Sequence, residues 1–203
     1  MKIGLILECC DSGPDQHVCE RLVNLILPEA ELAFTTMSGK RKLLLGCGEA
    51  AAIHLEEGCD RVLIVWDLYP AWEEYGKPPC LHQDRAQIFQ SLAAARINKD
   101  TDPVSLVCIK AELEAWLLAD GRALSACFST KTHPVTINDV RNPERIKKPK
   151  NKLSQIIYEN RCGTKYQDHI HAKKIAAQIP DCTRLRRCET FKRFEEQVRR
   201  GNP

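Results

Sequence analysis

Short apolar runs alternate with amphipathic segments over the first 120 residues of the chain. Runs that are this short and rich in β-branched residues predict strands buried on both faces. We assign them to 3–7, 32–37, 61–66 and 104–109. Apolar residues at helical spacing predict a helix from Asp15 that Pro28 ends, and further helices at 48–57, 84–95 and 112–119. This alternation predicts an α/β fold, an open and mainly parallel sheet flanked by helices.

The character of the chain changes after Asp120. Residues 129–151 are polar, are interrupted by three prolines and predict a loop or lid. Residues 153–158, 169–179 and 191–198 predict short helices with basic faces. We therefore expect an α/β domain at residues 1–120, and at 121–203 a basic loop and a small helical appendage packed on it.

The net charge of +3 combines two halves of opposite sign. Residues 1–120 contain 11 Lys and Arg against 19 Asp and Glu, a net charge of −8, and the remainder contains 19 against 8, a net charge of +11. Such asymmetry is expected of a metal-using half joined to a half that binds a polyanion. Two solvated surfaces that attract one another would show it too.

The N-terminal apolar run meets Glu8 too early for a signal peptide, and no run approaches the roughly 18 apolar residues that a membrane helix needs. We expect a cytoplasmic protein with no membrane partner. The eleven cysteines are odd in number and include no Cys-x-x-Cys pair, so they are expected to be reduced thiols.

Acidic residues follow three of the four predicted strands. Glu8 ends the first, Asp67 ends the third, and Glu112 and Glu114 follow the fourth. Ligands of open α/β sheets bind outside the carboxyl ends of the strands, and carboxylate oxygens suit Mg²⁺ or Mn²⁺. Two such ions would suit phosphodiester hydrolysis. A single acid at such a position is commonly a helix cap or a solvated loop residue, so the prediction depends on the set.

Glu112 and Glu114 cannot both face one metal ion from a continuous helix, because residues two apart point in nearly opposite directions. Both can contribute only if Glu112 still belongs to the end of the strand or to the first turn. His169 and His171 are candidates for metal or phosphate contacts, although surface or capping roles are the more ordinary interpretation.

The strand-end acids are similar to those of the Toprim fold, which topoisomerases, primases and OLD-type nucleases share. The segments Glu112–Asp120 (ELEAWLLAD) and Cys188–Phe194 (CETFKRF) resemble more closely a bacterial Toprim-like family, the domain of unknown function 4276. The resemblance covers nearly the whole chain. It implies a Toprim-like sheet, and a partner ATPase in a bacterial defence or mobile-element setting.

The resemblance also implies roles for single residues. Glu8 would be the Toprim glutamate, a metal ligand or general acid/base, and Asp67 the first acid of an Asp-x-Asp motif. Tyr69 replaces the second acid of that motif, and Glu112 or Glu114 would take its place. Asp15 or Asp11 would match the second acid of the opening motif. The comparison with OLD-type nucleases implies a catalytic lysine, for which Lys150 and Lys152 are the candidates.

The basic half supplies cations that a polyanion needs beside carboxylates. Lys and Arg neutralise phosphates without reading sequence, so binding would be salt-sensitive and weakly specific. The alternative is a solvated basic face. The residues expected to bind nucleic acid are Lys147, Lys148, Lys173, Lys174, Arg186 and Arg187.

Three functions are consistent with these features. The first is a Mg²⁺- or Mn²⁺-dependent nuclease acting on DNA or RNA. The second is a non-catalytic nucleic-acid-binding adaptor with a degenerate metal site, which Tyr69 favours. The third is a metal-dependent enzyme acting on a small phosphorylated substrate.

Overall fold

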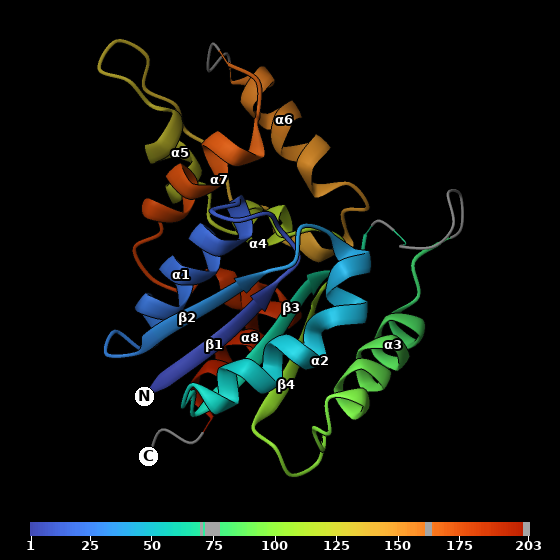
Figure 1. The fold of residues 1–203 in the computed structure, drawn as a ribbon. Coiled ribbons are helices and arrows are strands. Elements are labelled where there is room, and N and C mark those ends of the chain that lie inside the picture. Colours follow the sequence, from blue (N-terminus) through green and yellow to red (C-terminus); the bar gives the residue numbers. More distant parts are fainter. Residues whose placement is uncertain (70, 72–77, 161–163, 201–203) are drawn as a thin grey trace.

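The four apolar runs form the strands of one parallel sheet in the order β2-β1-β3-β4 (Figure 1). The computed structural model describes residues 1–69, 71, 78–160 and 164–200. The α/β fold expected from the sequence is confirmed. The strand bounds are Lys2–Leu7 for β1, Glu31–Thr36 for β2, Arg61–Asp67 for β3 and Val104–Ile109 for β4.

The register of the sheet aligns the carboxyl ends of its strands. Leu7 of β1 lies beside Thr36 of β2 and Val65 of β3, and Asp67 lies beside Ile109 of β4. The residues that follow the strands therefore enter loops at the same end of the sheet, the carboxyl end of its strands.

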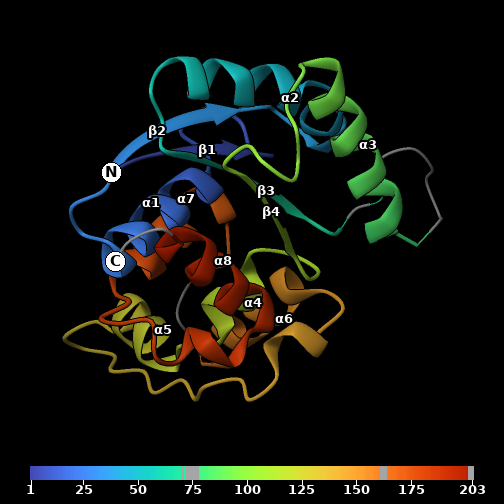
Figure 2. The ribbon, with the colours of Figure 1, turned by 90° about the horizontal axis from the view of Figure 1, so that it is seen from below.

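Two helices, α2 (Lys40–Glu56) and α3 (Leu81–Ala94), cover one face of the sheet (Figure 2). Helix α2 begins at Lys40 and not at Gly48 as predicted, because its two glycines weaken the helical signal of the segment. Gly48 permits a close approach of α3: a Cβ atom there would lie 2.0 Å from the carbonyl oxygen of Ser91. This packing compensates for the poor helix propensity of glycine.

The other face is covered by α1 and by helices of the C-terminal region, which share one hydrophobic core with the sheet (Figure 2). Trp116, Phe191 and Phe194 are fully buried there, and their ring centroids lie 5.3–6.2 Å apart. The helix bounds are Pro14–Ile26 for α1, Glu114–Leu118 for α4, Gly121–Phe128 for α5, Pro149–Glu159 for α6, Asp168–Ala177 for α7 and Glu189–Arg199 for α8.

Helix α5 is absent from the sequence prediction. The carboxylate of Asp120 accepts hydrogen bonds from the backbone N–H groups of Arg122 and Ala123 and so caps this helix. Residues 129–148 are irregular apart from a short 3₁₀ turn at Pro143–Arg145, and the end of the predicted loop belongs to the first turn of α6.

The sequence also predicts no membrane helix and no disulfide bonds. In the described part of the chain, no helix combines the length and apolarity needed to cross a membrane. The described cysteines are all free thiols.

Candidate active site

A cavity of about 420 Å³ opens at the carboxyl ends of β1 and β3. Six acidic side chains and one cation line it, together with Cys9, Cys10, Pro14, Ser38, Gly39 and Tyr69. The charged residues of the lining are Glu8, Asp15, Asp67, Glu112, Glu114, Asp168 and Lys150.

Strand ends and helix starts deliver these side chains. Glu8 directly follows β1 and Asp67 ends β3, while Asp15, Glu114 and Asp168 occupy the first turns of α1, α4 and α7. The partial positive charge at a helix N-terminus stabilises such carboxylates when they are ionised. The fold thus concentrates acids from distant parts of the sequence at the carboxyl end of the sheet.

The loops around the cavity contain strained backbone. Ser12, Ser38 and Ala111 have φ angles of 54°, 52° and 70°, in the left-handed region that non-glycine residues rarely adopt. Ala111 turns the chain from β4 toward Glu112, and its carbonyl accepts a hydrogen bond from the N–H of Tyr69 at 3.0 Å. Strained residues of this kind cluster at functional sites.

Lys150 binds two of the acids directly. Its Nζ atom lies 2.8 Å from Oδ2 of Asp168 and 3.8 Å from Oε1 of Glu114. Burial lowers the pKa of Lys150, but these two carboxylates outweigh that effect and raise the pKa above its usual value. The side chain is therefore a permanent positive charge in the cavity.

Glu112 lies before α4, in the position that allows it to share a site with Glu114. Its Oε2 atom accepts a hydrogen bond from the backbone N–H of Lys150 at 3.0 Å. This contact satisfies an N–H group at the start of α6. Glu112 therefore fixes the helix that carries Lys150, in addition to lining the cavity.

Glu114 is held by a buried tyrosine. The hydroxyl of Tyr166 donates a hydrogen bond of 2.9 Å to Oε1 of Glu114. Burial raises the pKa of Tyr166, and the neighbouring Glu114 raises it further, so the hydroxyl keeps its proton. The ring of Tyr166 stacks on His171 at 5.9 Å, and Nδ1 of His171 accepts the N–H of Gln167. Of the roles expected for His171, the structure shows capping, because the imidazole satisfies the N–H of Gln167 at the start of α7.

Four acids of the cavity, Glu8, Asp15, Asp67 and Glu114, hold protons more tightly than acids in water. Burial raises the pKa of Glu8 to about 7, although Lys40 and the N–H of Asp67 act in the opposite direction. Burial and the neighbouring Glu114 raise the pKa of Asp15 to about 6.

Asp67 and Glu114 are shifted in the same direction. Burial, with the charges of Asp15 and Glu8, raises the pKa of Asp67 well above its usual value. Burial also raises the pKa of Glu114, against the effect of Lys150. If all six carboxyl groups of the cavity were ionised, they would have more negative charge than Lys150 can balance.

A buried ion pair lies beneath the site. Nζ of Lys40 lies 2.9 Å from Oδ2 of Asp84 and donates a hydrogen bond of 2.7 Å to the carbonyl of Leu68. Asp84 also accepts the indole N–H of Trp66 at 3.1 Å. The two charged residues are 5% and 2% exposed. This network joins α2, α3 and the end of β3, and so supports Asp67.

The donor set of the cavity has the chemistry that a hard divalent cation requires. Carboxylate oxygens gather there without a histidine, and their uncompensated charge would be relieved by a cation. Within the ranges that the structure describes, no three Asp, Glu, His or Cys side chains form a ready-made metal-binding group. The lining thus offers oxygen atoms of the kind that a divalent cation binds, but these atoms are not arranged as a complete set of ligands around one point.

The predicted site residues fall into two groups. Glu8, Asp67, Glu112, Glu114 and Lys150 meet in the cavity. Lys152 does not line it, because its Nζ atom binds Oε1 of Gln155 at 3.2 Å. Of the alternatives for the second acid of the opening motif, Asp15 lines the cavity and the exposed Asp11 does not.

The predicted nucleic-acid-binding residues also separate. Lys147, Lys148, Lys173 and Lys174 are exposed. Arg186 forms a two-bond contact with Glu195, at 2.7 Å for each bond, and Arg187 lies 2.7 Å from Asp139. The two arginines are therefore engaged in holding the C-terminal region together.

Sequence reasoning missed Asp168 and Tyr166 as members of the site. Both lie in the basic half, where the surrounding lysines obscured them. Asp168 stands at the start of a predicted helix and next to His169, which is the only signal in the sequence that could have identified it.

Comparison with known families agrees with the resemblance in the sequence. The family described as Domain of unknown function (DUF4276) matches residues 23–199. The chain belongs to this family. The DUF4276 match includes Asp67, Glu112, Glu114, Lys150 and Asp168, while Glu8 and Asp15 precede it. No curated protein and no solved structure matches the chain.

Proposed function

We propose that the protein is a divalent-metal-dependent hydrolase that cleaves phosphodiester bonds in DNA or RNA. The proposal rests on one observation: six carboxylate side chains and Lys150 line a single cavity at the carboxyl ends of β1 and β3. This is where the ligands of parallel α/β sheets bind. It is also the arrangement that the resemblance to Toprim-like nucleases implies.

The metal-binding role falls to Asp15, Asp67 and Glu114, which line the cavity from the end of β3 and from the first turns of α1 and α4. A bound Mg²⁺ or Mn²⁺ would polarise a phosphoryl oxygen and make a water molecule more acidic. Tyr166 holds one oxygen of Glu114 and so restricts the orientation of that carboxylate.

Glu8 is suited to proton transfer, because a pKa of about 7 allows a carboxyl group to accept and release a proton near neutral pH. Lys150 keeps its positive charge and can stabilise negative charge that develops on a phosphoryl oxygen. Glu112 positions Lys150 by binding its backbone N–H.

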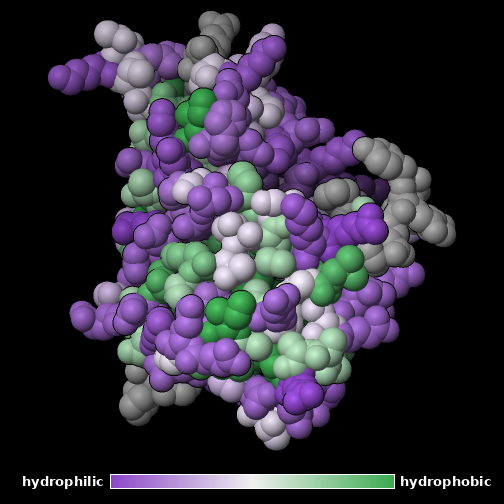
Figure 3. Space-filling view, in the orientation of Figure 1, coloured by the Kyte–Doolittle hydropathy of each residue, from purple (hydrophilic) through white to green (hydrophobic). Residues whose placement is uncertain are grey.

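The exposed Lys147 and Lys148 directly precede α6, two or three residues before Lys150, and would contact the phosphate backbone of the substrate. Hydrophilic residues cover most of the surface in the upper part of the molecule, where α6 lies, and apolar residues gather lower, over α2 (Figure 3). Such contacts carry no sequence information. Target selection by a partner ATPase, which the family resemblance implies, and a cytoplasmic location belong to the same proposal.

The decisive experiment incubates the purified protein with labelled single- and double-stranded DNA and RNA in Mg²⁺ or Mn²⁺. We expect cleavage that Glu8→Gln and Asp67→Asn abolish while nucleic-acid binding survives. Asp11→Asn is the matched control, since Asp11 is an exposed acid of the same loop outside the cavity, and it should cleave normally. Cleavage that persists in Asp67→Asn would contradict the proposal.

The second candidate is a non-catalytic nucleic-acid-binding adaptor. Tyr69 lines the cavity in the place of a motif acid, which favours this alternative. An adaptor would bind nucleic acid through Lys147 and Lys148 and cut it with neither metal, even when its partner is present.

A further inference from the structure

The outer side of β4 is an open edge of the sheet. Strand β4 pairs with β3 on one side, and none of the described strands pairs with it on the other. The carbonyls of Pro103 and Ile109 accept hydrogen bonds of 2.8 Å from Val62 and Leu68, in and after β3. Backbone groups of alternate residues point to opposite sides of a strand. Leu106 and Cys108 therefore direct their N–H and C=O groups to the open edge.

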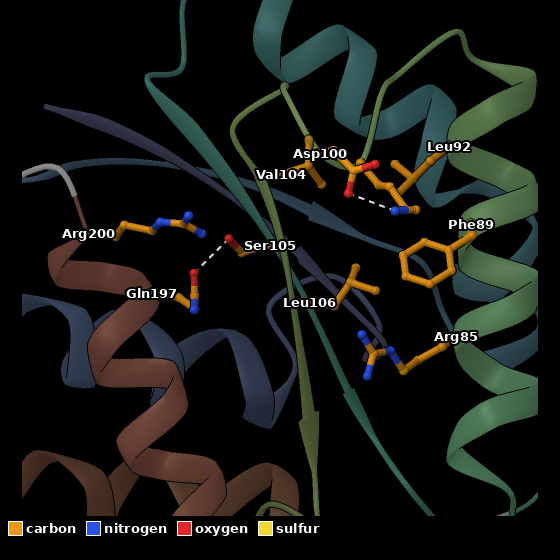
Figure 4. A pocket seen from close by; sticks show the side chains of 10 residues that line it. Arg85, Phe89, Leu92, Asp100, Val104, Ser105, Leu106, Gln197 and Arg200 are labelled. Carbon is orange, nitrogen blue, oxygen red and sulfur yellow. Dashed lines mark hydrogen bonds and ion pairs between the residues drawn. The ribbon is translucent and has the colours of Figure 1, made fainter.

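This edge lies in a hollow between two helices. A cavity of about 280 Å³ is lined by Val104, Ser105 and Leu106 of β4, by α3 and by the end of α8. Figure 4 shows β4 with α8 on one side and α3 on the other, and with Phe89 facing Leu106. Open strand edges are templates for pairing with another chain, and most are blocked by charges, bulges or covering segments.

The hollow is positively charged. Arg85, Lys99 and Arg200 line it, with Asp100 as the single acid of the lining. Lys99 binds Asp100 at 2.7 Å, whereas Arg85 and Arg200 have no ion pair within the described residues. The guanidinium of Arg85 lies 5.7 Å from the ring centroid of Phe89, which holds it at the rim. The arginines stand on the two sides of the strand, Arg85 from α3 and Arg200 after α8.

We propose that the edge of β4 binds an extended acidic segment of a partner protein, which adds to the sheet as a further strand. The backbone of the segment would pair with Leu106 and Cys108. Side chains of a strand alternate between its two faces, so acidic residues on the segment could reach Arg85 on one face and Arg200 on the other. Recognition of this kind takes its affinity from main-chain hydrogen bonds and its specificity from the flanking side chains. The surface is separate from the acidic cavity. Its arginines attract a negatively charged segment, whereas the carboxylates of the cavity attract a cation.

The probe is a terminally blocked peptide of about seven residues, the length of an ordinary strand, in which pairs of Glu alternate with pairs of Val, so that each face of the strand carries Glu. Amide hydrogen exchange of the full chain is followed by NMR with and without saturating peptide. The amides of Leu106 and Cys108 should exchange at least about tenfold more slowly when the peptide is bound. The Val107 amide faces β3 already and should not change, which makes it the internal control.

Two comparisons test the role of charge. The same peptide with Lys in place of Glu should not protect these amides. Arg85→Glu and Arg200→Glu should each weaken binding of the acidic peptide about two- to fivefold, the scale of one exposed charge contact. Arg193→Glu, which changes an exposed arginine of α8 outside the hollow, should bind the peptide normally.

The proposal is overturned if the acidic peptide leaves the Leu106 and Cys108 amides unprotected, or if the lysine peptide protects them equally. It is also overturned if inorganic phosphate at equal ionic strength displaces the peptide and reproduces its chemical-shift changes, because the hollow would then be a small-anion site. All the variants change exposed side chains, so loss of folding is not expected, and unchanged amide spectra of the free proteins will verify this.

Discussion

The carboxylate of Glu112 accepts the backbone N–H of Lys150 over 3.0 Å and so joins the end of β4 to the first turn of α6. Through this contact the acidic half of the chain determines where the basic half places its cavity lysine. Glu112→Ala removes the acceptor of a helix-terminal N–H and should lower the free energy of unfolding by about 1 kcal/mol. Glu112→Gln keeps an acceptor oxygen and should lose less than half of that. Thermal unfolding of the two variants measures the difference, and equal losses would show that the hydrogen bond is unimportant.

Lys150 and Lys152 form a matched pair for testing the role of the cavity cation. Lys150 contacts Glu114 and Asp168, whereas Lys152 contacts Gln155 outside the cavity. Removing one preorganised charge that stabilises a transition state typically costs about a hundredfold in rate. Lys150→Ala should therefore lower the cleavage rate by about that factor, and Lys152→Ala should change it less than about twofold. The assay is the one that tests the proposed function, and comparable losses in both variants would point to nonspecific electrostatics.

Glu8 makes the metal-free protein sensitive to pH. Its pKa is about 7 in the folded chain against 4.5 for an ordinary glutamate. A carboxyl whose pKa is raised by folding destabilises the fold when it ionises, so the free energy of unfolding should fall as pH rises from about 4.5 to about 7. The full loss above pH 7 amounts to at most about 3 kcal/mol.

Glu8→Gln removes this titration, so in chelator-treated samples the variant should be more stable than the parent at pH 8 and should show a flatter profile between pH 5 and 8. Denaturant unfolding across this range provides the measurement. A variant that is less stable than the parent at pH 8 would show that the Glu8 carboxylate is not destabilised by its surroundings.

The Lys40–Asp84 pair should dominate the stability of the support beneath the site. Asp84→Ala leaves the buried ammonium of Lys40 without this carboxylate and removes the acceptor of the Trp66 indole N–H. Breaking a buried pair in this way costs about 3–5 kcal/mol. Replacing both charges, in Lys40→Met with Asp84→Leu, should recover most of that stability, and a double variant as unstable as Asp84→Ala would disprove the pairing. Chemical denaturation measures both.

The sequence was sufficient to predict the four strands, their parallel arrangement and the strand-end acids Glu8 and Asp67, because these follow from local patterns and from one general property of α/β sheets. It could not predict the start of α2, since the close packing that tolerates Gly48 is a tertiary effect. Asp168 and Tyr166 could not be predicted as members of the site for a similar reason. Asp168 reaches the cavity and Tyr166 reaches Glu114 because α7 packs against α1, a contact between segments far apart in the chain.

The sequence alone also could not show which of Lys150 and Lys152 enters the cavity. Both follow the same loop, and no rule of spacing separates them. The hydrogen bond between Glu112 and Lys150 fixes the helix phase, so that one lysine faces the acids and the other faces solvent and Gln155.

The central claim is that the clustered carboxylates form a divalent-metal site, and calorimetric titration of Mn²⁺ into the metal-free protein tests it most directly. We expect saturable binding accompanied by release of protons near pH 7, because carboxyl groups with raised pKa values must ionise to bind the metal. Asp67→Asn should abolish the binding and Asp11→Asn should preserve it. The absence of saturable binding in the parent protein, or equal binding in Asp67→Asn, would contradict the account.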